Sequence, residues 1–134
     1  PPALLSRVDV LVPNRTELAL LAGADPAATI GEAARQARSL AGPRGVVVTL
    51  GAEGALVVSG EQAVPVPAPR VNAVDPTGAG DAFCAGLADA LVDGADLVAA
   101  TRWAVLCGAA AVTRRGAQAS LPTRAEAEAL GAAG

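Results

Sequence analysis

The sequence predicts an α/β domain with a central, mostly parallel sheet that helices cover on both sides. The order of apolar patterns is strand, helix, helix, strand, hairpin, helix, helix, which is typical of this class. The strand patterns are continuous apolar runs rather than alternating ones, which indicates strands buried on both faces. Hydrophobic residues make up 52% of the 134 residues, enough for the core of one domain.

The first half of the chain predicts one strand and two helices. Residues 8–13 form a short apolar run that ends at a proline, as expected for a buried strand. A short helix over 16–24 follows, with Thr16 as its N-cap and Gly23 as its stop. A second helix is expected over 29–42, where apolar residues recur at helical spacing.

The rest of the chain predicts three strands and three helices. Residues 45–50 are β-branched and apolar, which favours a strand buried on both faces. A strand over 54–60 follows, and the prolines in 62–69 indicate an edge strand. The remaining helices are expected at 79–92, 96–116 and 123–131, the last one with a possible cap at Thr123.

Missing residue types exclude several kinds of chemistry. The chain has no histidine, so it contains neither a Ser-His-Asp triad nor a histidine zinc site. All ten basic residues are arginine, and the absence of lysine excludes a P-loop NTPase and a Schiff-base enzyme. Proton transfer must therefore fall to a carboxylate. Phosphate charge must be met by arginine, backbone N–H groups or a metal ion.

Charge and hydropathy also limit the partners. The net charge of −3 is unlike that of a nucleic-acid-binding protein. No apolar run reaches the length of a membrane span, and no signal peptide opens the sequence. We therefore expect a cytoplasmic protein that binds neither nucleic acid nor membrane.

The stretch DPTGAGDAF, residues 75–83, is the strongest candidate for a functional site. One interpretation is a tight bend and a helix cap, since acidic residues are common in first helical turns. The other is an anion cradle made by the N–H groups at the helix start, with Asp81 as a base. The glycines Gly78 and Gly80 favour the second interpretation, because a phosphate needs close backbone approach and a cap does not.

Two further segments have a structural and a functional interpretation. In PNRTE, Asn14 and Glu17 are three residues apart where a strand runs into a helix. They fit a capping partnership, or polar groups at a strand end that face a ligand, with Glu17 holding Mg²⁺ through water. In TLGAEG, Thr49 ends a strand and Gly51 and Gly54 bracket a turn. One interpretation of this turn is a simple hairpin, and the other is that it lines the same ligand-binding crevice as Asn14 and Glu17.

The segment AVTRRGAQAS, residues 111–120, is expected to end a long helix at Gly116, with Ser120 following. Unsatisfied helix carbonyls, the Ser120 hydroxyl and Asp75 suit a monovalent cation. The alternative is an ordinary C-cap whose basic residues favour the negative end of the helix.

Taken in their order along the chain, the four segments resemble the C-terminal half of PfkB-type carbohydrate kinases, which have the ribokinase-like fold. DPTGAGDAF is similar to the D-T-x-G-A-G-D signature, with Pro76 in place of the commoner threonine. NRTE resembles the N-x-x-E motif and TLGAEG the T-x-G-x-x-G loop, and VTRRGAQASLP is similar to the tail of ribokinases specifically. The resemblance implies that residues 1–134 are the C-terminal nucleotide-binding part, without the N-terminal half and its lid.

The resemblance also implies roles for individual residues. Asp81 would be the catalytic base, and its own N–H would complete an anion hole formed by Gly78, Ala79 and Gly80. ATP and Mg²⁺ would be held by Asn14, Glu17, Thr49, Gly51 and Gly54, with Val105 near the adenine. Potassium would be bound by the Asp75 carboxylate, the Ser120 hydroxyl and the carbonyls of Thr77, Ala111, Arg114 and Gly116.

The implied activity is ATP-dependent phosphorylation of the primary hydroxyl of a sugar, with D-ribose to D-ribose 5-phosphate favoured by the tail. Two alternatives stay open: a family member acting on a fructose derivative or a nucleoside, and a nucleotide-binding fragment without turnover. Because the sugar-binding half is missing, we expect this chain alone to be inactive. A homodimer is one possibility for the complete kinase.

Overall fold

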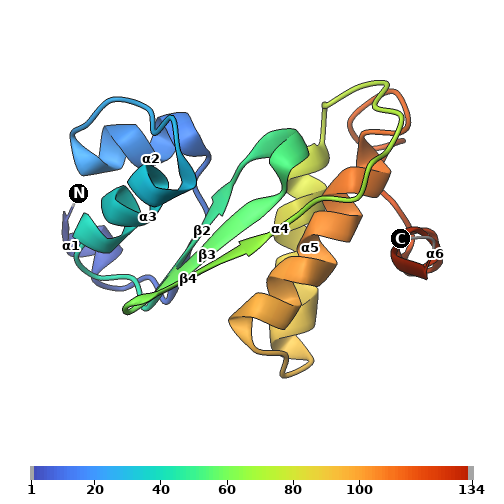
Figure 1. Cartoon of the computed structure of the whole chain (residues 1–134). Coiled ribbons are helices and arrows are strands. Elements are labelled where there is room, and N and C mark those ends of the chain that lie inside the picture. The colour runs from blue at the N-terminus through green and yellow to red at the C-terminus, as the bar shows by residue number, and fades with distance from the viewer. Residues whose placement is uncertain (1, 133–134) are drawn as a thin grey trace. The chain divides into compact units, whose positions relative to one another are not determined.

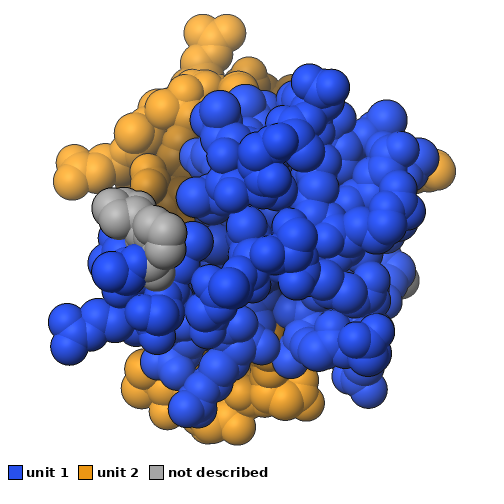
Figure 2. Space-filling view, turned by 90° about the vertical axis from the view of Figure 1, so that its left-hand side faces the viewer, with its two compact units in different colours: residues 1–66 blue, residues 67–134 orange. Residues whose placement is uncertain are grey.

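The computed structural model describes residues 2–132. The chain divides into two compact units, residues 1–66 and 67–134, which Figure 2 shows in blue and orange. Unit 1 contains the sheet with the first helices, and unit 2 contains the glycine-rich segment and the last helices.

Unit 1 contains both helices and strands (Figure 1). Its helices are α1 (Pro2–Leu5), α2 (Arg15–Ala22), α3 (Ile30–Ser39) and the short 3₁₀ helix η1 (Gly51–Glu53). Its strands are β1 (Val10–Leu11), β2 (Gly45–Thr49), β3 (Ala55–Ser59) and β4 (Gln62–Val66). The first predicted strand is thus shorter than expected, and α1 and η1 lie where no helix was predicted.

The four strands form one sheet in the order β1, β2, β3, β4. β1 and β2 are parallel, whereas the β2–β3 and β3–β4 pairs are antiparallel. The prediction of a mostly parallel sheet is therefore wrong for this chain. The cause is connection length, because a parallel pair needs a crossover of about a dozen residues or more. α2 and α3 supply that crossover between β1 and β2, and the later strands are joined by turns.

Nearly all residues of β2 and β3 are buried on both faces, as predicted, whereas those of β1 are only half-buried. Val46 and Val48 of β2 pack in a cluster with Leu56 of β3 and with Ala33 and Ala37 of α3. The neighbouring residues along β2 and β3 point the other way and are buried as well. β4 is the last strand in the order, as expected of the proline-containing segment, and its Pro65 lies opposite Leu56.

The helices α2 and α3 begin at side-chain caps. Asn14, not the predicted Thr16, caps α2, because its side chain already accepts the Glu17 N–H. α2 ends at Gly23, which adopts the left-handed conformation as predicted. Thr29 caps α3 in the same manner as Asn14.

Unit 2 consists of α4 (Ala79–Val92), α5 (Leu97–Ala111) and α6 (Arg124–Ala132) (Figure 1). α4 has the predicted bounds, and it lies along α5, which Asp96 caps. α5 ends at Ala111 rather than at the predicted Gly116. Gly116 has a φ of 95°, which no helix residue adopts, and its N–H donates to the Asp75 carboxylate instead of to a helix carbonyl. No helix within residues 2–132 is long and apolar enough to cross a membrane.

We predict that Leu56→Ala lowers the free energy of unfolding by about 2–5 kcal/mol, because it opens a cavity beside Val46 and Ala33. Leu20→Ala is the matched control, since 78% of the Leu20 surface is exposed and its loss should change stability by less than about 0.5 kcal/mol. Urea denaturation followed by circular dichroism measures both. Equal losses would contradict this assignment of the core.

Candidate active site

Asn14 and Thr49 lie side by side where two strands end. They form a parallel bridge, and the Thr49 N–H donates to the Pro13 carbonyl at 2.9 Å. β1 and β2 run in parallel, so their carboxyl ends meet at one edge of the sheet. Ligands of open α/β sheets bind at this edge. The structure thus brings together two of the residues expected at a nucleotide site.

Asn14 and Glu17 form a capping box. The Asn14 side chain accepts the Glu17 N–H at 2.9 Å, and Glu17 Oε2 accepts the Asn14 N–H at 2.8 Å. The structural interpretation of this pair is therefore confirmed. The role of Asn14 and Glu17 in binding phosphates and Mg²⁺ stays a prediction. In that role Glu17 would use its second carboxylate oxygen, Oε1, because Oε2 takes part in the capping box.

The turn after β2 is a hairpin connection built on two glycines. Gly51 and Gly54 have φ values of 61° and 99°, so the turn requires glycine at both positions whatever it binds. An ion pair of 2.7 Å between Arg15 Nη2 and Glu53 Oε1 holds the turn against the start of α2. The turn is therefore fixed beside the strand ends that carry Asn14.

In unit 2, the two glycines of DPTGAGDAF have different surroundings. Gly78 caps α4 with a φ of 80°, and a Cβ there would lie 2.9 Å from the Ala117 carbonyl oxygen. The protein's own backbone therefore requires Gly78. Gly80 has ordinary helical geometry, and a Cβ there would meet nothing within 4 Å. Since glycine costs about 1 kcal/mol relative to alanine within a helix, neither packing nor conformation explains Gly80.

Asp81 is exposed in the first turn of α4. The helix hydrogen bonds begin with the Ala82 N–H, which donates to the Gly78 carbonyl, so the N–H groups of Gly80 and Asp81 precede them. The Ala79 N–H donates to the Pro76 carbonyl at 3.2 Å and is turned toward the protein. The N–H groups of Gly80 and Asp81 therefore have no partner within the helix, which suits an anion at this helix start.

Asp75 joins the glycine turn to the segment after α5. Its Oδ1 accepts the Thr77 N–H at 2.9 Å and its Oδ2 accepts the Gly116 N–H at 3.0 Å. These bonds, from Gly116 first and then from Thr77, lower the pKa of Asp75 from its usual 3.8 to about 2. The carboxylate is therefore ionised at neutral pH and oriented by backbone.

Residues 112–123 are here called the tail loop. Several of the residues expected to bind a monovalent cation lie in this loop or contact it. Ser120 is fully buried, and its hydroxyl donates to the carbonyls of Ala117 at 2.9 Å and Thr77 at 3.4 Å. Asp75 reaches the same loop at Gly116. Carboxylate, carbonyl and hydroxyl oxygens are ligands that hard cations prefer, so these residues fit such an ion.

Other predicted ligands are placed less directly. The Ala111 carbonyl ends α5 and accepts the Arg114 N–H at 3.3 Å. Val105 lies on α5 with 5% of its surface exposed, and its contact with a nucleotide stays a prediction. Within residues 2–132, no group of three or more His, Cys, Asp or Glu side chains is placed to hold a metal ion.

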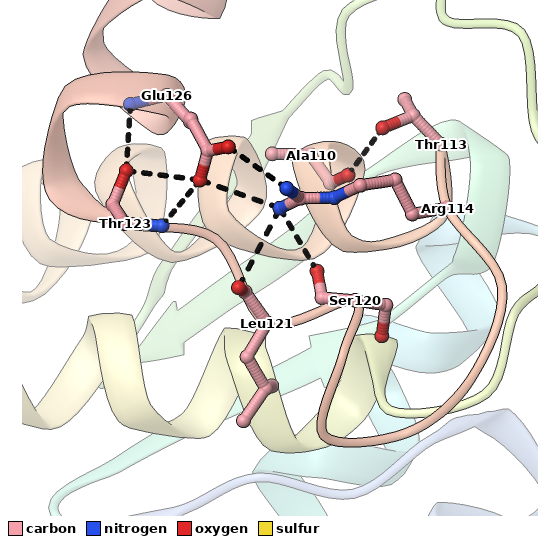
Figure 3. A network of polar contacts seen from close by, with 7 residues as sticks. All are labelled: Ala110, Thr113, Arg114, Ser120, Leu121, Thr123 and Glu126. Carbon is pink, nitrogen blue, oxygen red and sulfur yellow. Dashed lines mark hydrogen bonds and ion pairs between the residues drawn. The ribbon is translucent and has the colours of Figure 1, made fainter.

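The sequence interpretation missed Glu126. This residue forms an ion pair with Arg114, between Nη1 and Oε1 at 2.8 Å, at the end of the tail loop (Figure 3). Glu126 also accepts the Thr123 N–H at 2.7 Å. The available signal was the spacing of Thr123 and Glu126, which is that of a capping box.

Comparison with known proteins adds the deciding observation. The model of the pfkB family of carbohydrate kinases matches residues 2–124. The chain belongs to this family. The DPTGAGDAF, NRTE and TLGAEG segments all lie within the matched residues.

Relatives and solved structures in the pfkB family agree with this membership. The chain is 45% identical over 119 residues to a deoxyribokinase of Salmonella typhi, covering 87% of this chain and 39% of that protein. It superposes on the structure of Arabidopsis thaliana ribokinase complexed with ribose and ATP with a TM-score of 0.90 and 34% identity, covering 97% of this chain and 43% of that one. The ribokinase-like fold is therefore confirmed.

A second solved structure contains potassium. The Escherichia coli phosphofructokinase-2 in complex with potassium superposes with a TM-score of 0.85 and 27% identity, covering 98% of this chain and 43% of that one. Other relatives are named aminoimidazole riboside kinase and fructokinase. The chain spans about two fifths of the length of the deoxyribokinase, the Arabidopsis ribokinase and the phosphofructokinase-2.

We predict opposite effects of alanine at the two glycines. Gly78→Ala should lower the free energy of unfolding by about 2–4 kcal/mol, since the left-handed φ and the contact with Ala117 both oppose a Cβ. Gly80→Ala should leave stability unchanged or raise it by up to about 1 kcal/mol. Thermal and urea denaturation measure the difference. Similar losses at both positions would show that packing requires both glycines.

A second prediction concerns pH. Because the pKa of Asp75 is lower in the folded protein than in the unfolded chain, its contribution to stability is present above about pH 4. That contribution is lost as the pH falls toward 2. Asp75→Asn should therefore flatten the fall of the melting temperature between pH 4 and 2, as measured by differential scanning calorimetry. An unchanged pH dependence would contradict the bonds to Gly116 and Thr77.

Proposed function

We propose that residues 1–134 form the C-terminal, nucleotide-binding part of an ATP-dependent sugar kinase. The reaction is phosphorylation of a primary hydroxyl, and D-ribose is the preferred substrate. The observation that carries the proposal is Gly80. It is a glycine that the protein's own structure does not require, and it stands beside the exposed carboxylate of Asp81 at a helix start. Close approach of a phosphate to the backbone accounts for it.

In this mechanism, Asp81 accepts the proton of the attacking sugar hydroxyl as the hydroxyl oxygen forms a bond to the γ-phosphorus of ATP. The bond from that phosphorus to the ADP oxygen breaks, and ADP leaves. The N–H groups of Gly80 and Asp81 donate to the transferring phosphoryl oxygens, where the helix dipole also favours negative charge. Phosphoryl transfer depends mainly on such positioning and charge stabilisation, which suits a site without histidine or lysine.

The strand ends of unit 1 serve the nucleotide in this proposal. Asn14 and Thr49 face the phosphates, and the turn with Gly51 and Gly54 borders the nucleotide. Glu17 Oε1 would hold Mg²⁺ through a water. When bound, Mg²⁺ neutralises charge on the phosphates.

The tail loop serves potassium. Asp75, Ser120 and the carbonyls of Thr77, Ala111, Arg114 and Gly116 are the proposed ligands. A bound cation supplies positive charge close to the glycine turn, because Asp75 and Ser120 both contact that turn. The potassium complex of the related phosphofructokinase-2 supports the choice of potassium as the ion.

The choice of ribose rests on the tail VTRRGAQASLP and on the ribokinases among the relatives. Deoxyribokinase, aminoimidazole riboside kinase and fructokinase are also relatives, so the competing substrates are other pentoses, a nucleoside and fructose. Comparing kcat/KM of the complete kinase for these sugars tests the choice. A preference of tenfold or more (about 1.4 kcal/mol) for another sugar would replace ribose.

We predict that Asp81→Asn in the complete kinase lowers turnover by roughly 10²–10⁴-fold, the usual contribution of a positioned base. Folding and ATP affinity should be nearly unchanged, because Asp81 is exposed and asparagine is nearly isosteric. Steady-state kinetics and calorimetric titration with ATP measure the two effects separately.

Asp25→Asn is the matched control, since Asp25 is another exposed aspartate outside the proposed site. It should leave turnover and ATP affinity as they are. If Asp81→Asn keeps near-normal turnover, DPTGAGDAF is only a turn and a cap. If the unmodified complete kinase binds ATP but phosphorylates no sugar, the alternative of a nucleotide-binding protein without turnover holds.

A further inference from the structure

We propose that the ion pair between Arg114 and Glu126 positions the tail loop for its cation. This pair sets the affinity for the monovalent cation. The inference rests on the cation site of the proposed function, and both side chains act through the loop backbone rather than by touching the ion.

The pair closes the tail loop on itself (Figure 3). Arg114 lies near the start of the loop, and its Nη2 donates to the carbonyls of Ser120 at 3.3 Å and Leu121 at 3.5 Å, near the end. Glu126 Oε1 accepts a hydrogen bond from Arg114 Nη1 at 2.8 Å, and Glu126 Oε2 accepts one from Arg114 Nη2 at 3.3 Å. One guanidinium thus joins both ends of the loop to α6.

Glu126 is held in place by the start of α6. Its Oε2 accepts the N–H of Thr123 at 2.7 Å and the Thr123 hydroxyl at 2.9 Å. Both bonds come from the residue that precedes α6. The acceptor for Arg114 is therefore fixed at the start of a helix.

The proposed cation ligands depend on this closure. Ser120 is the loop residue whose hydroxyl is a proposed ligand, and its own carbonyl is one of those that Arg114 holds. Arg114 also contributes its backbone carbonyl to the proposed site. A loop ordered before the cation arrives loses less conformational freedom on binding, so it binds more tightly.

The size of the effect follows from exposure. The side chains of Arg114 and Glu126 are 40% and 46% exposed, so water screens their attraction. The fork of Arg114 nevertheless meets two oxygens of one carboxylate, a geometry that lysine does not reproduce. We therefore expect cation affinity to change by about two- to fivefold when the pair is broken.

A second arginine pair on α6 provides a matched control. Arg124 Nη2 contacts Asp89 of α4 at 2.6 Å, with side chains 55% and 46% exposed. This pair holds α6 in place without contacting the tail loop. A role limited to securing α6 would be shared by both pairs, whereas a role in the cation loop belongs to Arg114 and Glu126.

The experiment compares Glu126→Gln, Arg114→Lys and the control Asp89→Asn in the complete kinase. Potassium is titrated against tetramethylammonium at constant ionic strength. One readout is the half-saturating potassium concentration for turnover, and the other is the rise in melting temperature with potassium in the absence of substrate. We expect both readouts to shift to about two- to fivefold higher potassium in Glu126→Gln and Arg114→Lys, and neither to shift in Asp89→Asn.

The double variant Arg114→Gln with Glu126→Gln keeps the net charge and removes the pair. Continued weak binding of potassium in this variant supports positioning, whereas recovery of the original affinity would overturn it in favour of a simple charge effect. If the unmodified kinase responds to potassium and Glu126→Gln titrates identically, the inference alone fails. If the unmodified kinase shows no potassium response, the cation site fails and takes the inference with it.

Discussion

Both oxygens of the Asp75 carboxylate accept backbone N–H groups, one from Thr77 and one from Gly116, 41 residues away. This constraint fixes the glycine turn and the tail loop as one assembly in unit 2. It holds the Gly116 amide outside any helical pattern, and the carbonyl of Val112, the C-cap of α5, accepts the N–H groups of Val74 and Asp75 at 2.7 and 3.1 Å. A single carboxylate therefore connects the segment before α4 with the segment after α5. The candidate chemistry of unit 2 depends on these two segments.

The sequence predicted most elements because apolar spacing and caps are local signals. α4 was predicted with its observed bounds, and Thr29 and Asp96 stand where α3 and α5 begin. The direction of the sheet was predicted wrongly, since an apolar run shows that a strand is buried but not which neighbour it pairs with. The end of α5 was also predicted wrongly, because no glycine or proline lies between Ala111 and Gly116 to mark a stop, and the hydrogen bond of Gly116 to the distant Asp75 is not visible in the sequence.

The candidate site was recognised from the sequence as motifs, and the structure separates the reasons for their residues. Gly78, Gly51 and Gly54 serve the backbone, whereas Gly80 has no internal explanation. These glycines look equivalent in the sequence motifs, because neither their φ angles nor the space around a missing Cβ can be read from a sequence. Glu126 was missed for a related reason: it meets Arg114 through a tertiary contact across twelve positions.

Pro65 in β4 has a consequence for how the sheet behaves in solution. It lies in the last strand of the sheet order, opposite Leu56. A strand that approached β4 from outside would find no N–H at this residue, so a continuous ladder between molecules is interrupted there. A single proline thus protects a valine-rich sheet against edge-to-edge aggregation, at a position where it removes no bond that the fold itself needs.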